Sequence, residues 1–106
     1  MPTVKECIAL LTNLERFKVV IKKKFSIGGL TKHDFKFTDT TITQQIVACL
    51  DYPVRAVVSE YDEKNNIVKL FVIDQDQDLI DKILELEDEH YNEHGLYKIR
   101  KKEQKK

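Results

Sequence analysis

Two short segments separated by a polar turn constrain the fold of this chain most strongly. Residues 54–61 and 67–73 are rich in β-branched and aromatic side chains, which favour strands. Residues 62–66 (DEKNN) between them supply the turn of a β-hairpin. The second strand is apolar on both faces, with Ile67, Phe71 and Ile73 on one and Val68, Leu70 and Val72 on the other. We therefore expect this strand to be central in its sheet, or one of its faces to be covered by another subunit.

Three segments have the apolar spacing of helices. We predict the first helix over residues 3–14, where Thr3 and Glu6 form a capping box at its start. Thr41 with Gln44 is a second such box and opens a helix over residues 40–50. The third helix covers residues 78–93. Its apolar side comprises Leu79, Ile80, Ile83, Leu84, Leu86 and Tyr91.

Other segments have weaker signals. Residues 17–21 (FKVVI) favour a strand, but a continuation of the first helix stays open because no Gly or Pro intervenes. Gly28 and Gly29 predict that residues 26–30 form a loop or turn. We expect short strands at 35–37 and at 96–99.

The order of these elements predicts one α+β domain over residues 1–99. About three helices would cover a small, largely antiparallel sheet, and residues 100–106 would form a disordered basic tail. No apolar run approaches the roughly 20 residues that span a bilayer, and no secretory signal opens the chain. We expect a cytoplasmic protein that uses no membrane, with Cys7 and Cys49 reduced and buried.

Charge is divided into blocks along the chain. Lys+Arg and Asp+Glu both total 18, so the formal net charge is zero. Residues 1–36 nevertheless carry a net +5, residues 67–93 a net −7, and residues 94–106 a net +5. Such blocks mark segments where neighbouring segments or partners attach by charge.

The predicted third helix has an acidic stripe opposite its apolar side. At 100° per residue, six carboxylates share this stripe: Asp78, Asp81, Glu85, Asp88, Glu89 and Glu93. The stripe is either a solvated outer face or a docking surface for a basic partner. That partner could be the chain's own Lys22–Lys24, its basic tail, or the basic groove of a nucleic-acid-binding protein.

The same region contains a partial calcium pattern. Asp74, Asp76, Asp78 and Glu85 stand at positions 1, 3, 5 and 12 of an EF-hand loop. Leu79 replaces the turn glycine, and a strand precedes the loop where an EF-hand has a helix. We therefore expect the aspartates to cap the helix rather than to bind calcium.

Histidines and cysteines do not assemble a metal or catalytic motif. His90 and His94 are four residues apart on one helical face, but two ligands do not make a zinc site. Serine nucleophile and phosphate-loop motifs are missing. His33, His90 and His94 would be the proton-transfer groups of a small enzyme built at a dimer interface. We expect a protein that is not an enzyme and needs no metal or cofactor.

Basic segments support an alternative. Lys22, Lys23 and Lys24 lie near Phe17 and Phe25, and Arg100, Lys101 and Lys102 open the basic tail. Basic side chains beside exposed aromatics can follow a phosphate backbone and stack on bases. A nucleic-acid-binding accessory protein is therefore the alternative, although a pI near 6.8 is low for one.

The sequence thus predicts a small protein-interaction module. Its acidic stripe would dock another protein with a basic surface, as in an accessory or inhibitor protein of a phage or mobile element. Its sheet, through Val68, Leu70 and Val72, would support a homo-oligomer.

Overall fold

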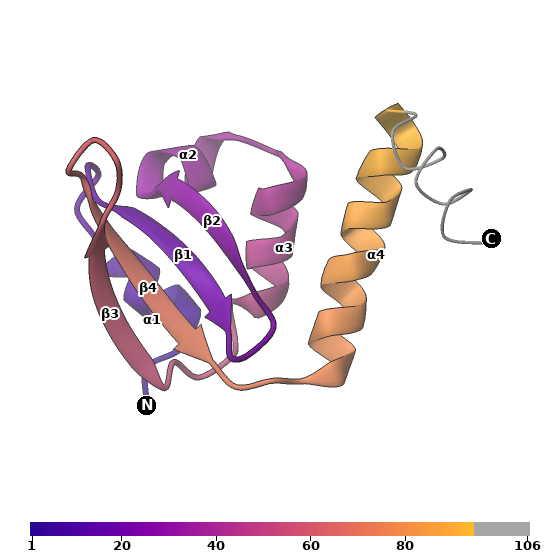
Figure 1. The fold of residues 1–106 in the computed structure, drawn as a ribbon, viewed down its shortest axis with the longest axis horizontal. Helices are drawn as coiled ribbons and strands as arrows, with labels where there is room; N and C mark the ends of the chain where they lie inside the picture. Colours follow the sequence, from indigo (N-terminus) through magenta and orange to yellow (C-terminus); the bar gives the residue numbers. More distant parts are fainter. Residues whose placement is uncertain (95–106) are drawn as a thin grey trace.

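The computed structural model describes the backbone of residues 1–94 and the side chains of residues 1–88. Four strands form one sheet in the order β2-β1-β4-β3 (Figure 1). The strands are β1 (Arg16–Ile21), β2 (Phe25–Thr31), β3 (Ala56–Tyr61) and β4 (Ile67–Ile73). The predicted hairpin is confirmed as β3 and β4, and residues 17–21 are strand rather than helix.

The sheet is mixed but mainly antiparallel. β1 pairs antiparallel with β2, and β3 pairs antiparallel with β4. β1 and β4 run parallel in the middle of the sheet, with Val19 opposite Phe71. β4 therefore has a neighbour on each edge, which confirms the central position that its two apolar faces predicted.

Helices α1 (Val4–Ala9), α2 (Lys32–Phe37) and α3 (Thr41–Cys49) lie on one face of this sheet. The fourth helix, α4 (Gln77–His94), packs against α3. Figure 1 shows α1 behind the strands, α3 beside β2, and α4 beyond α3, at the end of the fold opposite to β3. The α+β class is thus as predicted, with α2 as an additional helix.

The core lies between the sheet and these helices. Phe17 stacks on Phe71 with ring centroids 5.9 Å apart, and the Phe35 ring meets Phe17 edge-on at 6.0 Å. Alternate residues of β1, including Val19 and Ile21, are fully buried on this face. Burial of such apolar side chains is the main force that stabilises the fold.

The first helix is shorter than predicted. It keeps the expected capping box between Thr3 and Glu6 but ends at Ala9 instead of near residue 14. The side-chain amine of Lys32 donates to the Ala9 carbonyl oxygen at 2.9 Å, and this carbonyl would otherwise lack a partner at the helix end. Leu14, assigned to the apolar face of the helix, is instead 89% exposed.

Residues 25–37 differ most from prediction. The predicted loop at 26–30 is part of strand β2, which accommodates its glycines through a register shift against β1. The predicted strand at 35–37 belongs to helix α2, because Thr31 and Asp34 form a capping box that starts a helix.

The second and third predicted helices are confirmed with small changes. The N-cap of α3 is Thr40, whose hydroxyl accepts from Thr43 N, so the predicted box at Thr41 lies one residue too late. In α4, Leu79, Ile80 and Ile83 are buried as predicted, but Leu84 is almost half exposed. The predicted strand at 96–99 and the basic tail lie outside the described residues.

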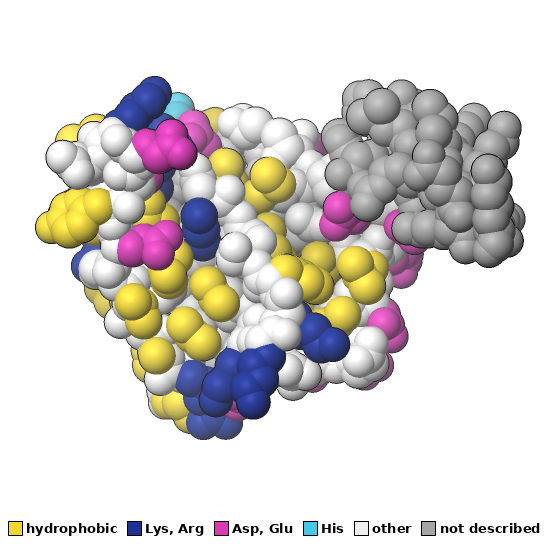
Figure 2. All heavy atoms as spheres, in the orientation of Figure 1, with side chains coloured by type: hydrophobic (Ala, Val, Ile, Leu, Met, Phe, Trp, Pro, Cys, Tyr) yellow, Lys and Arg dark blue, Asp and Glu magenta, His cyan; other side chains and the backbone are white. Residues whose placement is uncertain are grey.

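Within residues 1–94, no helix lies on the other face of the sheet. Val20, Val58, Leu70 and Val72 occupy it, because directly paired residues share a face. Figure 2 shows several hydrophobic side chains on this face, with charged side chains between and around them. Val68 lies on it as well and is nearly buried, next to the paired Arg16 and Glu60 in neighbouring strands.

Candidate functional site

The acidic stripe is exposed wherever the structure describes it. Asp78, Asp81, Glu85 and Asp88 are all exposed on α4, while the opposite side of this helix packs against α3. A buried hydrogen bond also joins α4 to α3, from Gln45 Nε2 to the Ile83 carbonyl oxygen at 3.0 Å. The helix is therefore anchored by one side and presents its carboxylates on the other. The side chains of Glu89 and Glu93 lie outside the described residues.

Few counter-charges reach this stripe in the described part of the chain. Lys82 Nζ lies 3.9 Å from Glu85 Oε1, with both side chains more than half exposed. Asp81 accepts a hydrogen bond from the Gln77 amide at 2.8 Å. The ion pairs of the described residues do not include Lys22–Lys24, so this basic segment forms no ion pair with Asp78, Asp81, Glu85 or Asp88.

The two aspartates before α4 have different partners. Asp76 Oδ1 accepts from Leu79 N at 3.1 Å, so Asp76 caps the helix as predicted. Asp74 pairs with Arg55 at 2.6 Å. Within residues 1–88, no three His, Cys, Asp or Glu side chains are grouped as a metal site would require.

The basic segment near the N-terminal half forms the turn between β1 and β2. Lys22, Lys23 and Lys24 are all exposed. Phe17, however, is fully buried in the core, and Phe25 is packed against it. The described residues of this turn therefore offer lysines for phosphates but lack the two exposed aromatic rings that the sequence pattern suggested. Arg100, Lys101 and Lys102 lie outside the described residues.

His33 is exposed, whereas Cys7 and Cys49 are buried. His33 is exposed on α2, where its ring lies 4.7 Å from that of Phe37. Cys7 and Cys49 are buried and not bridged to each other. Burial raises the pKa of the Cys49 thiol to about 12, and burial followed by the charge of Glu6 raises that of Cys7. Neither thiol is activated as a nucleophile.

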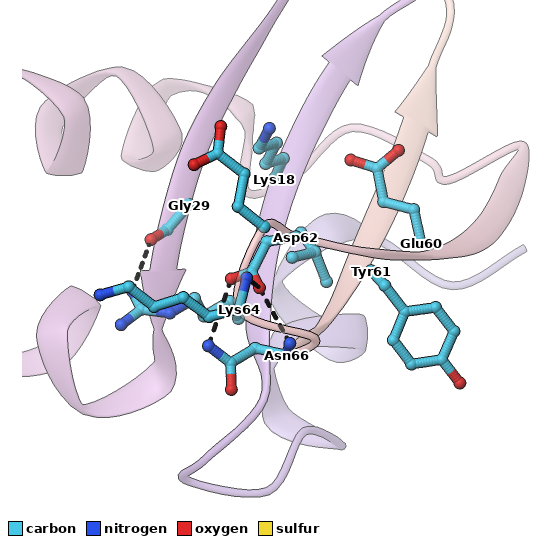
Figure 3. A pocket seen from close by; sticks show the side chains of 10 residues that line it. Lys18, Gly29, Glu60, Tyr61, Asp62, Lys64 and Asn66 are labelled. Atoms are coloured by element: carbon cyan, nitrogen blue, oxygen red, sulfur yellow. Dashed lines mark hydrogen bonds between the residues drawn. The ribbon is translucent and has the colours of Figure 1, made fainter.

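A polar hollow of about 530 Å³ lies at the turn end of the hairpin. Figure 3 shows Lys18, Glu60 and Lys64 around it, with the Tyr61 ring directed away. Asp62 serves the turn itself, because it accepts from the backbone N–H groups of Asn66 and Lys64 at 2.8 and 2.9 Å. The Asn66 bond, the larger cause, holds the pKa of Asp62 below its usual value.

Sequence reasoning missed this hollow. It forms because β1 and β4 lie in parallel, which brings Arg16 and Lys18 beside the β3–β4 turn. Nothing in the local pattern of either segment predicts that pairing. Its lining mixes carboxylates with amines and contains no histidine or cysteine.

Comparisons with known proteins found no match: no family model, no curated protein and no solved structure is similar to this chain. Among the residues that the structure describes, no helix combines the length and the apolar character that crossing a membrane would require.

Proposed function

We propose that this protein is a non-enzymatic interaction module that docks a basic protein partner through the acidic stripe of α4. The observation that carries the proposal is the division of this helix into two sides. One side is fixed to α3 by buried Leu79, Ile80 and Ile83, and the other presents exposed carboxylates. A rigidly held row of like charges steers an oppositely charged surface and sets its register.

The test compares partners captured by three forms of the tagged protein. The first is wild type, and the second carries Asp81→Lys, Glu85→Lys and Asp88→Lys. The control reverses an equal number of charges elsewhere, with Lys22→Glu, Lys23→Glu and Lys24→Glu. We expect quantitative mass spectrometry to find a basic protein captured by wild type and by the control but lost from the α4 variant. An unchanged set of captured proteins would remove the stripe as the docking surface.

Nucleic-acid binding stays as the second candidate because three consecutive lysines are exposed at the β1–β2 turn. Its test is fluorescence anisotropy with labelled single- and double-stranded DNA and RNA at about 50 and 200 mM salt. Binding that weakens steeply with salt and disappears in the Lys22–Lys24 reversal would establish this candidate. The absence of binding at both salt concentrations would eliminate it.

A further inference from the structure

In the described part of the chain, no strand pairs with the outer edge of β3. All six residues of β3 are exposed, including Val57 at 52% and Tyr61 at 69%. Natural edge strands are commonly blunted by proline, lysine or a bulge, because an open edge invites pairing with another chain. β3 contains none of these three features. The opposite edge differs, because β2 has a register shift at its glycines and the Arg16 guanidinium donates to Gly29 O.

The hydrogen-bond pattern shows which backbone groups face outward. Asp62 N donates to Asn66 O at 3.0 Å, in the same register as the β3–β4 pairs. In an antiparallel ladder, bonded pairs recur at every second residue. Val58 and Glu60 therefore bond to β4, and the N–H and C=O groups of the odd-numbered residues of β3 point to the free edge. These residues are Val57, Ser59 and Tyr61.

An apolar hollow lies beside this edge. It measures about 190 Å³ and is lined by Leu10 and Leu11 after α1, together with Val57 and Phe71. The remaining lining residues are Cys7, Glu15 and Lys69. Val57 and Tyr61 share one face of β3, since they are four residues apart in the strand. The edge thus has an exposed aromatic ring at one end and an exposed apolar hollow at the other.

We infer that β3 pairs antiparallel with β3 of a second copy of this chain, in a register centred on Ser59. Each outward residue then finds a partner: Ser59 meets its own copy, and Val57 meets Tyr61. The two Tyr61 rings cover the two hollows beside Val57, and aromatic with β-branched side chains make favourable cross-strand pairs. The interface is isologous, as in most homodimers.

Charge supports the same register. Arg55, which also pairs with Asp74, precedes β3, whereas Asp62 and Glu63 follow it. Two copies paired antiparallel about Ser59 place the basic start of each strand beside the acidic end of the other. Glu60 lies opposite Val58 of the second copy instead of another carboxylate, so the register avoids a like-charge pair. A parallel arrangement would align the like-charged ends.

Sedimentation equilibrium over a wide concentration range tests this inference. We expect wild type to dimerise, and Ser59→Pro to raise the dimer dissociation constant by about 30-fold, because each copy loses one edge hydrogen bond. Ser59→Ala, which keeps the backbone N–H, should dimerise like wild type. Since Ser59 N–H does not bond to β4, proline at this edge position should leave the fold intact, which circular dichroism checks.

A second variant avoids any backbone change. Tyr61→Lys alters a mostly exposed side chain, and we expect it to weaken the dimer. The control is Val47→Lys, at an exposed position of α3, which should leave the dimer unchanged. A monomer at all concentrations of wild type, or a dimer unaffected by both Ser59→Pro and Tyr61→Lys, would overturn the inference. A dimer lost with Val20→Lys alone would also overturn it, because the open sheet face would then be the interface. The acidic stripe of α4 is not altered by these variants, so the outcome is independent of the proposed function.

Discussion

Gly28 and Gly29 are adjacent in the sequence but have different surroundings. Gly28 has φ +134°, and a Cβ there would lie 2.7 Å from the Phe17 carbonyl oxygen, a backbone atom that cannot move aside easily. Gly29 has φ +85°, and a Cβ there would meet nothing within 4 Å. Strand β2 contains these glycines where its register shifts against β1, because both positions have a positive φ that glycine adopts readily.

This difference predicts unequal costs of substitution. Gly28→Ala should lower the free energy of unfolding by about 2–4 kcal/mol, because it adds a backbone clash to an unfavourable φ. Gly29→Ala should lower it by only about 1 kcal/mol, from the positive φ alone. Urea denaturation of both variants measures the two values, and equal losses would show that the close approach to Phe17 is not tight.

The two thiols provide a second prediction at the same scale. Because burial raises the pKa of Cys49 to about 12 and also raises that of Cys7, both thiols stay protonated at neutral pH. We expect native protein to react with a disulfide reagent such as DTNB only very slowly, and urea-unfolded protein to release two equivalents at once. Rapid release of one equivalent from native protein would mean that one cysteine is accessible.

A carboxylate near β1 predicts a pH effect. Glu15 accepts from Thr12 N at 2.9 Å, and this backbone hydrogen bond is the largest cause that lowers its pKa below the ordinary 4.5. A lowered pKa contributes stability above the unfolded-state value, and this contribution is lost as pH falls through the folded-state value. We expect Glu15→Gln to be less stable than wild type at pH 7, with a difference that shrinks in acid. Thermal unfolding from pH 7 to pH 3 measures this, and a difference that grows in acid would contradict it.

At the scale of the element, the caps decide where helices start. Thr40 and Thr41 are both plausible N-caps in the sequence, but it is the Thr40 hydroxyl that accepts from Thr43 N, at 3.2 Å. Thr40→Ala should therefore lower the free energy of unfolding by about 1 kcal/mol. Thr41→Ala, the matched control, should change it by less than about 0.5 kcal/mol. The reverse order in chemical denaturation would place the cap at Thr41.

Elements with a strong periodic signal could be predicted from the sequence, and those decided by distant contacts could not. The hairpin has apolar alternation and a polar turn, and α4 has a long apolar face, so both are found near their predicted places. The end of α1 depends on Lys32, which is 23 residues away from Ala9. The strand β2 contains two glycines that indicate a turn by local propensity, but its pairing with β1 overrides that preference.

Among the candidate surfaces, too, one has a local sequence pattern and the others depend on contacts between distant segments. The acidic stripe is a helical pattern, so the exposure of Asp78, Asp81, Glu85 and Asp88 could be expected from spacing alone. The polar hollow and the free edge of β3 depend on the strand order, which sequence patterns do not specify. Phe17 shows why the nucleic-acid-binding pattern could not be judged from the sequence. It is an aromatic residue flanked by basic residues, but in the structure it is part of the core.

At the scale of the whole molecule, the two proposed surfaces lie at opposite ends. Figure 1 places β3 at one end of the fold and α4 at the other. A dimer built through β3 would leave both acidic stripes free and directed away from the interface. Such a dimer would present two docking surfaces, and binding at one would raise the effective concentration at the second where a partner offers two basic sites.

Zero-length cross-linking tests the central claim most directly. A carbodiimide joins carboxylates to lysines only where they touch, and mass spectrometry identifies the linked residues. In a native extract containing the tagged protein, we predict cross-links from Asp78, Asp81, Glu85 or Asp88 to lysines of a second protein. Intermolecular cross-links confined to other carboxylates, such as Glu60 and Glu63, would contradict the assignment of the α4 stripe as the docking surface.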